Sequence, residues 1–282
     1  MTLIHVNICT HKRPLGLVGT VMSLQRLRSK QHEVRFRIGI DEGDDDSAAA
    51  AANLAQECPI DVSIGPRPVA RGEIENRLLR GSADADIVTM LTDRTFCITP
   101  GWDDALAKGV KEQPKRLLWW SCPEDQGCTM PIIPRAWREA ADNNWSPEIF
   151  PFWFDDTWNQ QIDLMIYGMP SLKILTNFSG QRAKTNRARD FAFWINLFNE
   201  LLPLRAQKAQ DMAARLGVEA PGRPEVLSYI TQHYQTLLAN VPVLEKHFGD
   251  VGEPGPEYVI AKERAEKLFA EMLTQAPKEA AE

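Results

Sequence analysis

The chain of 282 residues lacks several features that would assign it to a special class. No apolar run approaches the roughly 18 to 20 residues that span a bilayer. There is no internal repeat, and no low-complexity tract apart from the alanine-rich Ser47–Gln56. The first residues read as a strand, without the charged and then long apolar segments of a signal peptide. These absences predict a cytoplasmic protein with no transmembrane segment.

Cysteine and positive charge are also scarce. The five cysteines are an odd number and scattered, and no histidine follows Cys122 and Cys128 at a zinc-finger spacing. This favours a reducing compartment without a disulfide framework. The net charge of −6 argues against broad, nonspecific binding to nucleic acid or anionic membranes. One basic stretch, residues 181–189, could touch a phosphate backbone, although such runs more often begin a solvated helix.

The first 120 residues alternate short apolar runs with segments of helical periodicity. Strands are predicted at residues 3–9, 34–40, 60–64, 87–91 and 116–121. The segments between these runs are predicted as helices or polar turns. Such alternation predicts an α/β fold with a mainly parallel sheet that is flanked by helices on both faces.

The rest of the chain changes character twice. Residues 122–180 are less regular and rich in Trp, Pro and Phe, and residues beyond 185 show helical patterns. One such helix is expected to continue from Phe191 through Pro203 towards Leu216. We predict a domain at residues 1–180 and an α-helical C-terminal extension at residues 181–282.

The apolar run at residues 87–91 ends on Asp93, with Thr92 and Arg94 on either side. Ligands of open α/β sheets collect at the carboxyl ends of strands, so this acid is a candidate site residue. One carboxylate can take one coordination position on Mg²⁺ or Mn²⁺, with phosphate oxygens and waters completing the shell. A site for a metal-bound diphosphate would normally carry a second acid, and Arg94 could neutralise a diphosphate without metal.

Two earlier turns carry further candidates. Thr10, His11 and Arg13 lie between the first strand and a helix, where free N–H groups and a guanidinium suit a phosphate. The alternative is a solvated turn with Thr10 as N-cap. Asp41 ends the second strand, where its carboxylate could accept a hydrogen bond from an imide N–H such as that of uracil. The following acids, residues 44–46, could simply cap the next helix.

Three further groups of residues each have a functional and a structural explanation. Arg71, Asn76 and their charged neighbours lie at the start of, or within, a helix predicted from about residue 72 to residue 83. They could reach a diphosphate or form an ordinary solvated surface. Asp103 and Asp104 are best explained as the acidic start of a helix. Asp155 and Asp156 lie among Phe152, Trp153, Phe154 and Trp158. Apolar surroundings raise a carboxyl pKa towards the range of a general base, but both acids could equally cap a helix from Thr157.

Taken in order, these segments resemble the inverting glycosyltransferases of the GT-A fold, of the family-2 kind. The resemblance covers roughly residues 3–180 and is carried by six segments: Ile8–Pro14, Ile40–Asp45, Glu75–Arg77 with Ala83–Ile87, Leu91–Arg94, Thr99–Trp102 and Asp155–Trp158. The sequence departs from the family at two motifs. It keeps a single acid in the Asp-x-Asp motif, and has Asp-Asp where the base motif is usually Glu-Asp.

The resemblance implies a Rossmann-like sheet and transfer of a sugar from a nucleotide-sugar donor, expected to be UDP-linked, to an acceptor hydroxyl with inversion. The donor-binding set it implies is Thr10, His11, Arg13, Asp41, Arg71, Asn76, Thr92 and Asp93. Arg94 would stabilise the leaving diphosphate, Asp93 would bind Mn²⁺ or Mg²⁺, and Asp156 or Asp155 would be the base.

Two other functions remain open at this point. One is a catalytically inactive GT-A-fold binding module. The other is a sugar-phosphate nucleotidyltransferase, which would want a glycine-rich, lysine-containing first turn, whereas this turn offers only Gly16. The acceptor class is also open between a glycan, a lipid, a protein and, as a minority option, a modified DNA base. The helical tail could support a homo-oligomer.

Overall fold

The computed structural model describes residues 1–121, 130–150, 154–180, 189–219, 224–249 and 254–275. Its strands are β1 (Leu3–Thr10), β2 (Glu33–Asp41), β3 (Ile60–Gly65), β4 (Ile87–Thr92), β5 (Thr95–Cys97), β6 (Leu118–Ser121), β7 (Pro131–Pro134) and β8 (Leu172–Gly180). Its helices are α1 (Pro14–Leu27), α2 (Asp45–Leu54), α3 (Arg71–Arg80), α4 (Trp102–Glu112), α5 (Arg135–Ala140), α6 (Phe154–Tyr167), α7 (Phe191–Glu200), α8 (Leu202–Leu216), α9 (Pro224–Ala239), α10 (Val241–Phe248) and α11 (Pro256–Gln275).

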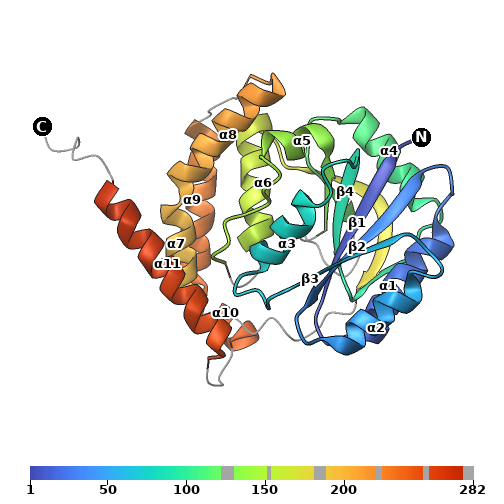
Figure 1. The fold of residues 1–282 in the computed structure, drawn as a ribbon. Coiled ribbons are helices and arrows are strands. Elements are labelled where there is room, and N and C mark those ends of the chain that lie inside the picture. The colour runs from blue at the N-terminus through green and yellow to red at the C-terminus, as the bar shows by residue number, and fades with distance from the viewer. Residues whose placement is uncertain (122–129, 151–153, 181–188, 220–223, 250–253, 276–282) are drawn as a thin grey trace, which may run out of the picture.

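The strands of the described residues form one sheet in the order β3-β2-β1-β4-β7-β6-β8-β5. The β3-β2-β1-β4 part is parallel throughout, and β7 runs antiparallel between β4 and β6. Helices cover both faces of the sheet (Figure 1). This confirms the predicted α/β class with a mainly parallel sheet flanked by helices.

The two faces of the sheet belong to two hydrophobic clusters because successive strand residues point to opposite sides. In β4, Ile87 and Leu91 join the cluster under α1, α2 and α4, whereas Val88 and Met90 join the cluster under α3, α5 and α6. Continuous apolar runs are therefore typical of these strands, which are buried on both faces.

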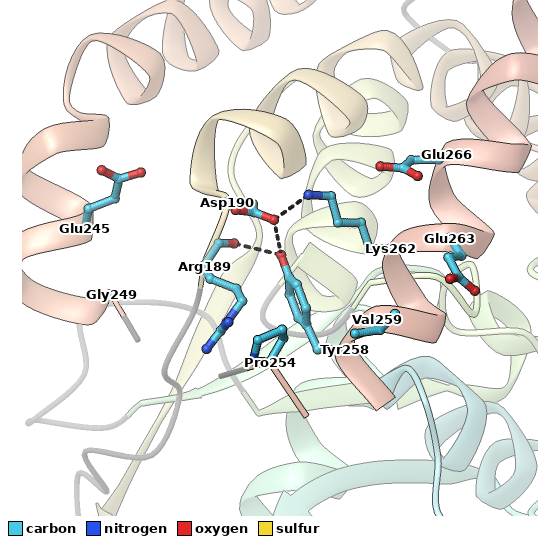
Figure 2. A pocket seen from close by; sticks show the side chains of 10 residues that line it. All are labelled: Arg189, Asp190, Glu245, Gly249, Pro254, Tyr258, Val259, Lys262, Glu263 and Glu266. Atoms are coloured by element: carbon cyan, nitrogen blue, oxygen red, sulfur yellow. Dashed lines mark hydrogen bonds and ion pairs between the residues drawn. The ribbon is translucent and has the colours of Figure 1, made fainter. Parts of the chain in front are cut away.

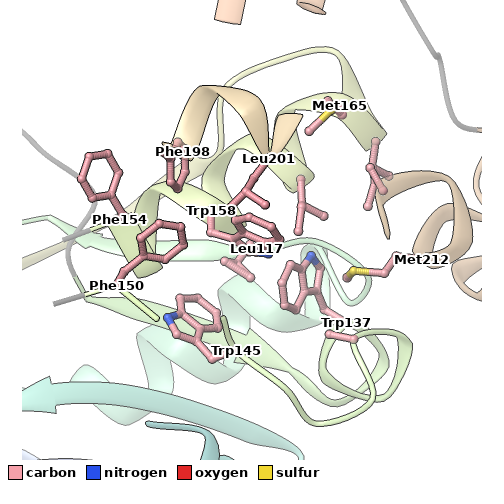
Figure 3. Close-up of a cluster of buried hydrophobic side chains, with 14 of the residues drawn as sticks. Leu117, Trp137, Trp145, Phe150, Phe154, Trp158, Met165, Phe198, Leu201 and Met212 are labelled. Atoms are coloured by element: carbon pink, nitrogen blue, oxygen red, sulfur yellow. The ribbon is translucent and has the colours of Figure 1, made fainter. Parts of the chain in front are cut away.

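The second cluster continues from the sheet into the C-terminal helices. Trp158 of α6 packs edge-on against Phe198 of α7, and Phe154 and Phe150 contact the same phenylalanine ring (Figure 3). Residues of α8, α9 and α11 extend this cluster without interruption. The helical region therefore shares a core with the sheet, while the boundary at residue 180 stays a prediction.

Three local features differ from the sequence prediction. The helix expected to run through Pro203 ends at Glu200, and α8 begins at Leu202 with Pro203 in its first turn, where a missing N–H is harmless. The short strand β5 and helix α10 were not predicted.

Among the described residues, no helix combines the length and hydropathy needed to cross a bilayer.

Candidate active site

The carboxyl ends of three neighbouring parallel strands bring the predicted site residues together. Thr10 ends β1, Asp41 ends β2 and Thr92 ends β4. In the register of the sheet, Thr10 is opposite Ile40 and Cys9 is opposite Thr92. Residues far apart in the sequence therefore meet at one edge of the sheet. We call Thr10, His11, Arg13, Asp41 and Asp93 the strand-end group.

Asp93 lies directly after β4 and is buried, with 5% of its surface exposed. Its Oδ2 accepts a 2.9 Å hydrogen bond from the Thr10 hydroxyl, and its Oδ1 lies 3.5 Å from Nη1 of Arg13. Burial raises the pKa of Asp93, and these two partners oppose the rise. Thr10 is not the N-cap of α1, because Arg13 occupies that position and the Thr10 hydroxyl is bonded to Asp93 instead.

Asp41 is paired with His11 across the two turns. Nδ1 of the half-exposed His11 lies 2.7 Å from Oδ2 of the buried Asp41. Burial raises the pKa of Asp41, while His11, Arg67 and Arg77 favour its charged form. Asp44, in the same turn as Asp41, caps α2 through the Ser47 N–H and also accepts a 2.5 Å bond from the Lys12 N–H. The two turns are therefore fixed to each other.

Thr92 and Arg94 occupy the sharp turn between β4 and β5. The hydroxyl groups of Thr92 and Thr95 are 3.1 Å apart, which closes this turn. Arg94 is half-buried in it, next to Asp93 in the chain. Their part in donor binding stays a prediction.

A second group of charged residues lies between α3 and α6. Arg71 Nε is 2.6 Å from Oε1 of Glu75, one helical turn further along α3, and 3.2 Å from Oδ2 of Asp155. Its Nη1 is 3.9 Å from Oδ2 of Asp156. The three acids are almost completely buried, with exposed fractions of 2% for Glu75, 0% for Asp155 and 2% for Asp156. We call these four residues the helix acid cluster.

Cys9 links the two groups electrostatically. Glu75 and Asp93 both favour the neutral thiol, and Arg71 and Arg77 favour the thiolate, while burial raises the thiol pKa further. Charges of both groups therefore act on one side chain of β1.

Asn76, predicted to bind the donor, has no exposed surface. Its amide oxygen accepts from the Trp145 and Ser146 N–H groups at 2.6 and 3.3 Å, and its amide nitrogen donates to the Ser146 carbonyl at 2.9 Å. Asn159 of α6 donates to the Trp145 carbonyl at 2.6 Å. The loop at 145–146 is thus bonded to both α3 and α6, and this geometry favours a structural role for Asn76.

The structure gives two residues of α3 contacts that the sequence did not predict. The sequence shows Glu75 and Arg77 only as members of a charged helix. Charge alone does not tell which face of that helix is buried. In the structure Glu75 belongs to the helix acid cluster, and the Arg77 guanidinium packs against Gly65 at the end of β3. A side chain at Gly65 would collide with that guanidinium. In the sequence this glycine signals only that some group approaches the strand end closely, and it does not identify Arg77.

The described aromatic residues near Asp155 belong to the hydrophobic core. Phe154 and Trp158 are buried in the core, so they do not form an open wall for a sugar. Phe152 and Trp153 lie outside the described residues. Trp102 is also buried, and the carboxylates of Asp103 and Asp104 accept hydrogen bonds from Ser29, in agreement with a structural role.

The strand-end group contains two carboxylates, of which Asp41 is paired with His11 and Asp93 is the predicted metal ligand. Among the described residues, no cluster of three His, Cys, Asp or Glu side chains is placed to hold an ion. Mg²⁺ and similar ions are often held by one or two carboxylates together with substrate phosphates. An ion bound with substrate phosphates would take Oδ1 of Asp93 as its ligand, because the 3.5 Å contact of Oδ1 with Arg13 is longer than the 2.9 Å hydrogen bond of Oδ2 with Thr10.

A pocket of about 690 Å³ lies in the helical region between α7, α10 and α11 (Figure 2). Asp190 accepts bonds there from the Tyr258 hydroxyl at 3.0 Å and from Lys262 at 2.6 Å. None of the predicted site residues lines this pocket. Its lining carries charges of both signs, of which Asp190 and Lys262 pair with each other, and it indicates no particular ligand.

Comparison with solved structures identifies the fold. The chain resembles S. aureus TarS 1-349 in complex with UDP-GlcNAc with a TM-score of 0.57 at 13% identity, over 94% of this chain and 80% of that one. It resembles mannosyltransferase PcManGT from Pyrobaculum calidifontis, in complex with GDP-Man and Mn²⁺, with a TM-score of 0.55 at 10% identity, over 96% and 82% of the two chains. The protein therefore has a GT-A-like glycosyltransferase fold, as the resemblance implied. No family model matches the sequence, and no curated protein does.

Proposed function

We propose that the protein is a glycosyltransferase that moves a sugar from a nucleotide-sugar donor to an acceptor hydroxyl with inversion at the anomeric carbon. The observation that supports this most is the position of two acidic groups on the GT-A-like fold. The strand-end group lies where open α/β sheets bind ligands. Charges of the helix acid cluster and of the strand-end group both act on the Cys9 thiol of β1.

The strand-end group is assigned to the nucleoside diphosphate. Asp41, oriented by His11, accepts a hydrogen bond from the imide N–H of the base, which in uracil is N3–H. Thr10, Arg13 and Asp93 lie beside the diphosphate. A divalent ion bound with the donor would take one ligand from Asp93 and supply positive charge to the phosphates.

The helix acid cluster is assigned to the acceptor. Asp155 or Asp156 removes the proton of the acceptor hydroxyl as its oxygen attacks the anomeric carbon in line. The bond to the diphosphate breaks and its electron pair leaves with the phosphate oxygen. Negative charge then grows on the diphosphate, so the guanidinium groups of Arg13 and Arg94 contribute most to lowering the barrier.

The acceptor is to be sought among four classes: a glycan, a lipid, a protein or a modified DNA base. The basic stretch at 181–188 that motivates the last class lies outside the described residues, apart from its final neighbour Arg189. A cytoplasmic location and a homo-oligomeric assembly are further parts of the proposal.

The test is donor hydrolysis, which glycosyltransferases commonly catalyse slowly without acceptor. The wild type is incubated with UDP- and GDP-sugars in Mn²⁺, Mg²⁺ or EDTA, and nucleotide release is measured beside Asp156→Asn, Asp41→Asn and the exposed control Asp46→Asn. Release by the wild type and control, with loss in the two site variants, supports the proposal. Binding of nucleotide without any turnover would favour the inactive binding module, and no binding at all would refute both.

A further inference from the structure

The helix acid cluster contains one acid that the proposed reaction does not use. Glu75 lies on α3, one turn from Arg71, and has 2% of its surface exposed. Its Oε1 lies 2.6 Å from Nε of Arg71, and the same Nε atom lies 3.2 Å from Oδ2 of Asp155, so one guanidinium nitrogen joins the two carboxyl groups. Its Oε2 is buried and accepts no hydrogen bond from the described residues.

Two buried carboxyl groups in contact cannot both be ionised without a large cost, and a hydrogen bond between them requires a proton. Arg71 is the cation that the described residues bring to both Glu75 and Asp155. Its single charge compensates one carboxylate and not two. Oε2 of Glu75 and both carboxyl oxygens of Asp155 are buried and have no hydrogen-bond partner among the described residues, whereas buried oxygens are almost always hydrogen-bonded. One proton between the two groups would satisfy an oxygen of each.

We propose that Glu75 is protonated at neutral pH and donates a hydrogen bond to Asp155, so that the pair and Arg71 form a neutral unit that positions Asp156 as the base. Asp155 is tied to Arg71 at 3.2 Å, whereas Asp156 lies 3.9 Å from the same guanidinium. Glu75 is thus a positioning residue. The base assignment rests on the proposed function, but the proton on Glu75 does not.

The groups that face Glu75 agree with this protonation state. Arg71 on its own helix favours the charged form, while burial and the two aspartates of α6 favour the neutral form. The net result is a Glu75 pKa well above its ordinary value. In turnover the acceptor proton goes to Asp156 and then to water, and the Glu75 proton stays in place.

The direct test needs no donor. Infrared spectra of the full chain at about pH 8 should show the carbonyl band of a protonated carboxylic acid. Asp163, another buried acid, does not contribute at this pH, because its pKa is raised only to about 6. The band should disappear in Glu75→Gln and persist in the control Glu73→Gln, which lies on the same helix but pairs with Arg264. A wild type without the band, or a Glu75→Gln variant that keeps it, would overturn the proposal.

Activity then tests the positioning role. Glu75→Gln, which can still donate to Asp155, should retain more of the wild-type kcat than Glu75→Ala. It should also lack the fall in rate that loss of the Glu75 proton causes in the wild type at high pH. Glu75→Ala should lower kcat with little change in KM, by on the order of tenfold to a hundredfold, because small misplacements of catalytic groups have such effects. Equal losses in both variants would contradict the role. An intact band in a protein that turns over no donor would refute the proposed function and leave the protonated pair standing.

Discussion

The strand-end group and the helix acid cluster both bury carboxylates, but they compensate them differently. Asp41 has His11 as a partner, and Asp93 has Thr10 and Arg13. In the helix acid cluster, Glu75 and Asp155 share Arg71. Separate partners suit a site that must bind a charged ligand in one orientation. A shared cation leaves a proton inside the site, which suits acid–base chemistry.

The largest expected effect comes from removing the base. Asp156→Asn should lower the rate of sugar transfer about 10²- to 10⁴-fold, because general base catalysis contributes that much. Its affinity for the nucleotide should stay at the wild-type value, since the strand-end group is untouched. Single-turnover kinetics measure the rate, and Asp46→Asn on the exposed start of α2 is the matched control. A wild-type rate in Asp156→Asn would remove this residue from the mechanism.

The next largest effect should come from breaking the bonds between α3 and the loop at 145–146. Asn76→Ala leaves the buried N–H groups of Trp145 and Ser146 without their acceptor. We expect a loss of about 3 kcal/mol in the free energy of unfolding, because each buried unsatisfied group costs about 1–3 kcal/mol. Urea denaturation measures it, with the exposed Asn53→Ala on α2 as control. Unchanged stability with a specific loss of donor binding would instead restore Asn76 to the donor site.

Breaking the strand-end group should weaken nucleotide binding. Asp41→Asn should raise the Kd for UDP about tenfold to a hundredfold, because hydrogen bonds to charged groups contribute about 1.5–3 kcal/mol. Calorimetric titration with UDP, GDP and ADP measures the change and shows which base the site prefers. An equal loss for every nucleotide would place Asp41 away from the base.

The smallest effect concerns stability and pH. A carboxyl group whose pKa is higher in the folded chain stabilises the fold at low pH and loses that contribution as the pH rises through the folded pKa. Burial raises the Glu75 pKa well above its ordinary value. The wild type should therefore lose stability relative to Glu75→Gln as the pH rises above about 4.3, the ordinary value for glutamate. Parallel unfolding curves for Glu73→Gln serve as control, and a flat or rising difference for Glu75→Gln would contradict the account.

The two groups also differ in how far the sequence predicts them. Asp41 and Asp93 each follow an apolar strand directly, so the rule for strand ends in parallel sheets locates them. The contact of Arg71 and Glu75 with Asp155 depends on how α3 packs against α6, about 80 residues later in the chain. No local pattern shows which face of a charged helix is buried. For the same reason Asn76 suggested a donor ligand, while the structure bonds it to the loop at 145–146.

Sequence also predicted the sheet better than the helical region. Apolar runs with polar ends define β1, β2 and β4 within a residue or two. The break between α7 and α8 at Leu201 was missed because Pro203 is tolerated both in a first turn and in a kinked helix. The shared core around Phe198 was missed because its partners come from segments that are far apart in the sequence.

The central claim is that the strand-end group binds the nucleotide while the helix acid cluster performs the chemistry. The most direct measurement gives the Kd for UDP and the single-turnover rate of a UDP-sugar for the wild type, Asp41→Asn and Asp156→Asn in the same buffer. The account predicts that Asp41→Asn raises the Kd and that Asp156→Asn lowers the rate at an unchanged Kd. The same parameter changing in both variants, or a wild type that binds no nucleotide, would contradict it.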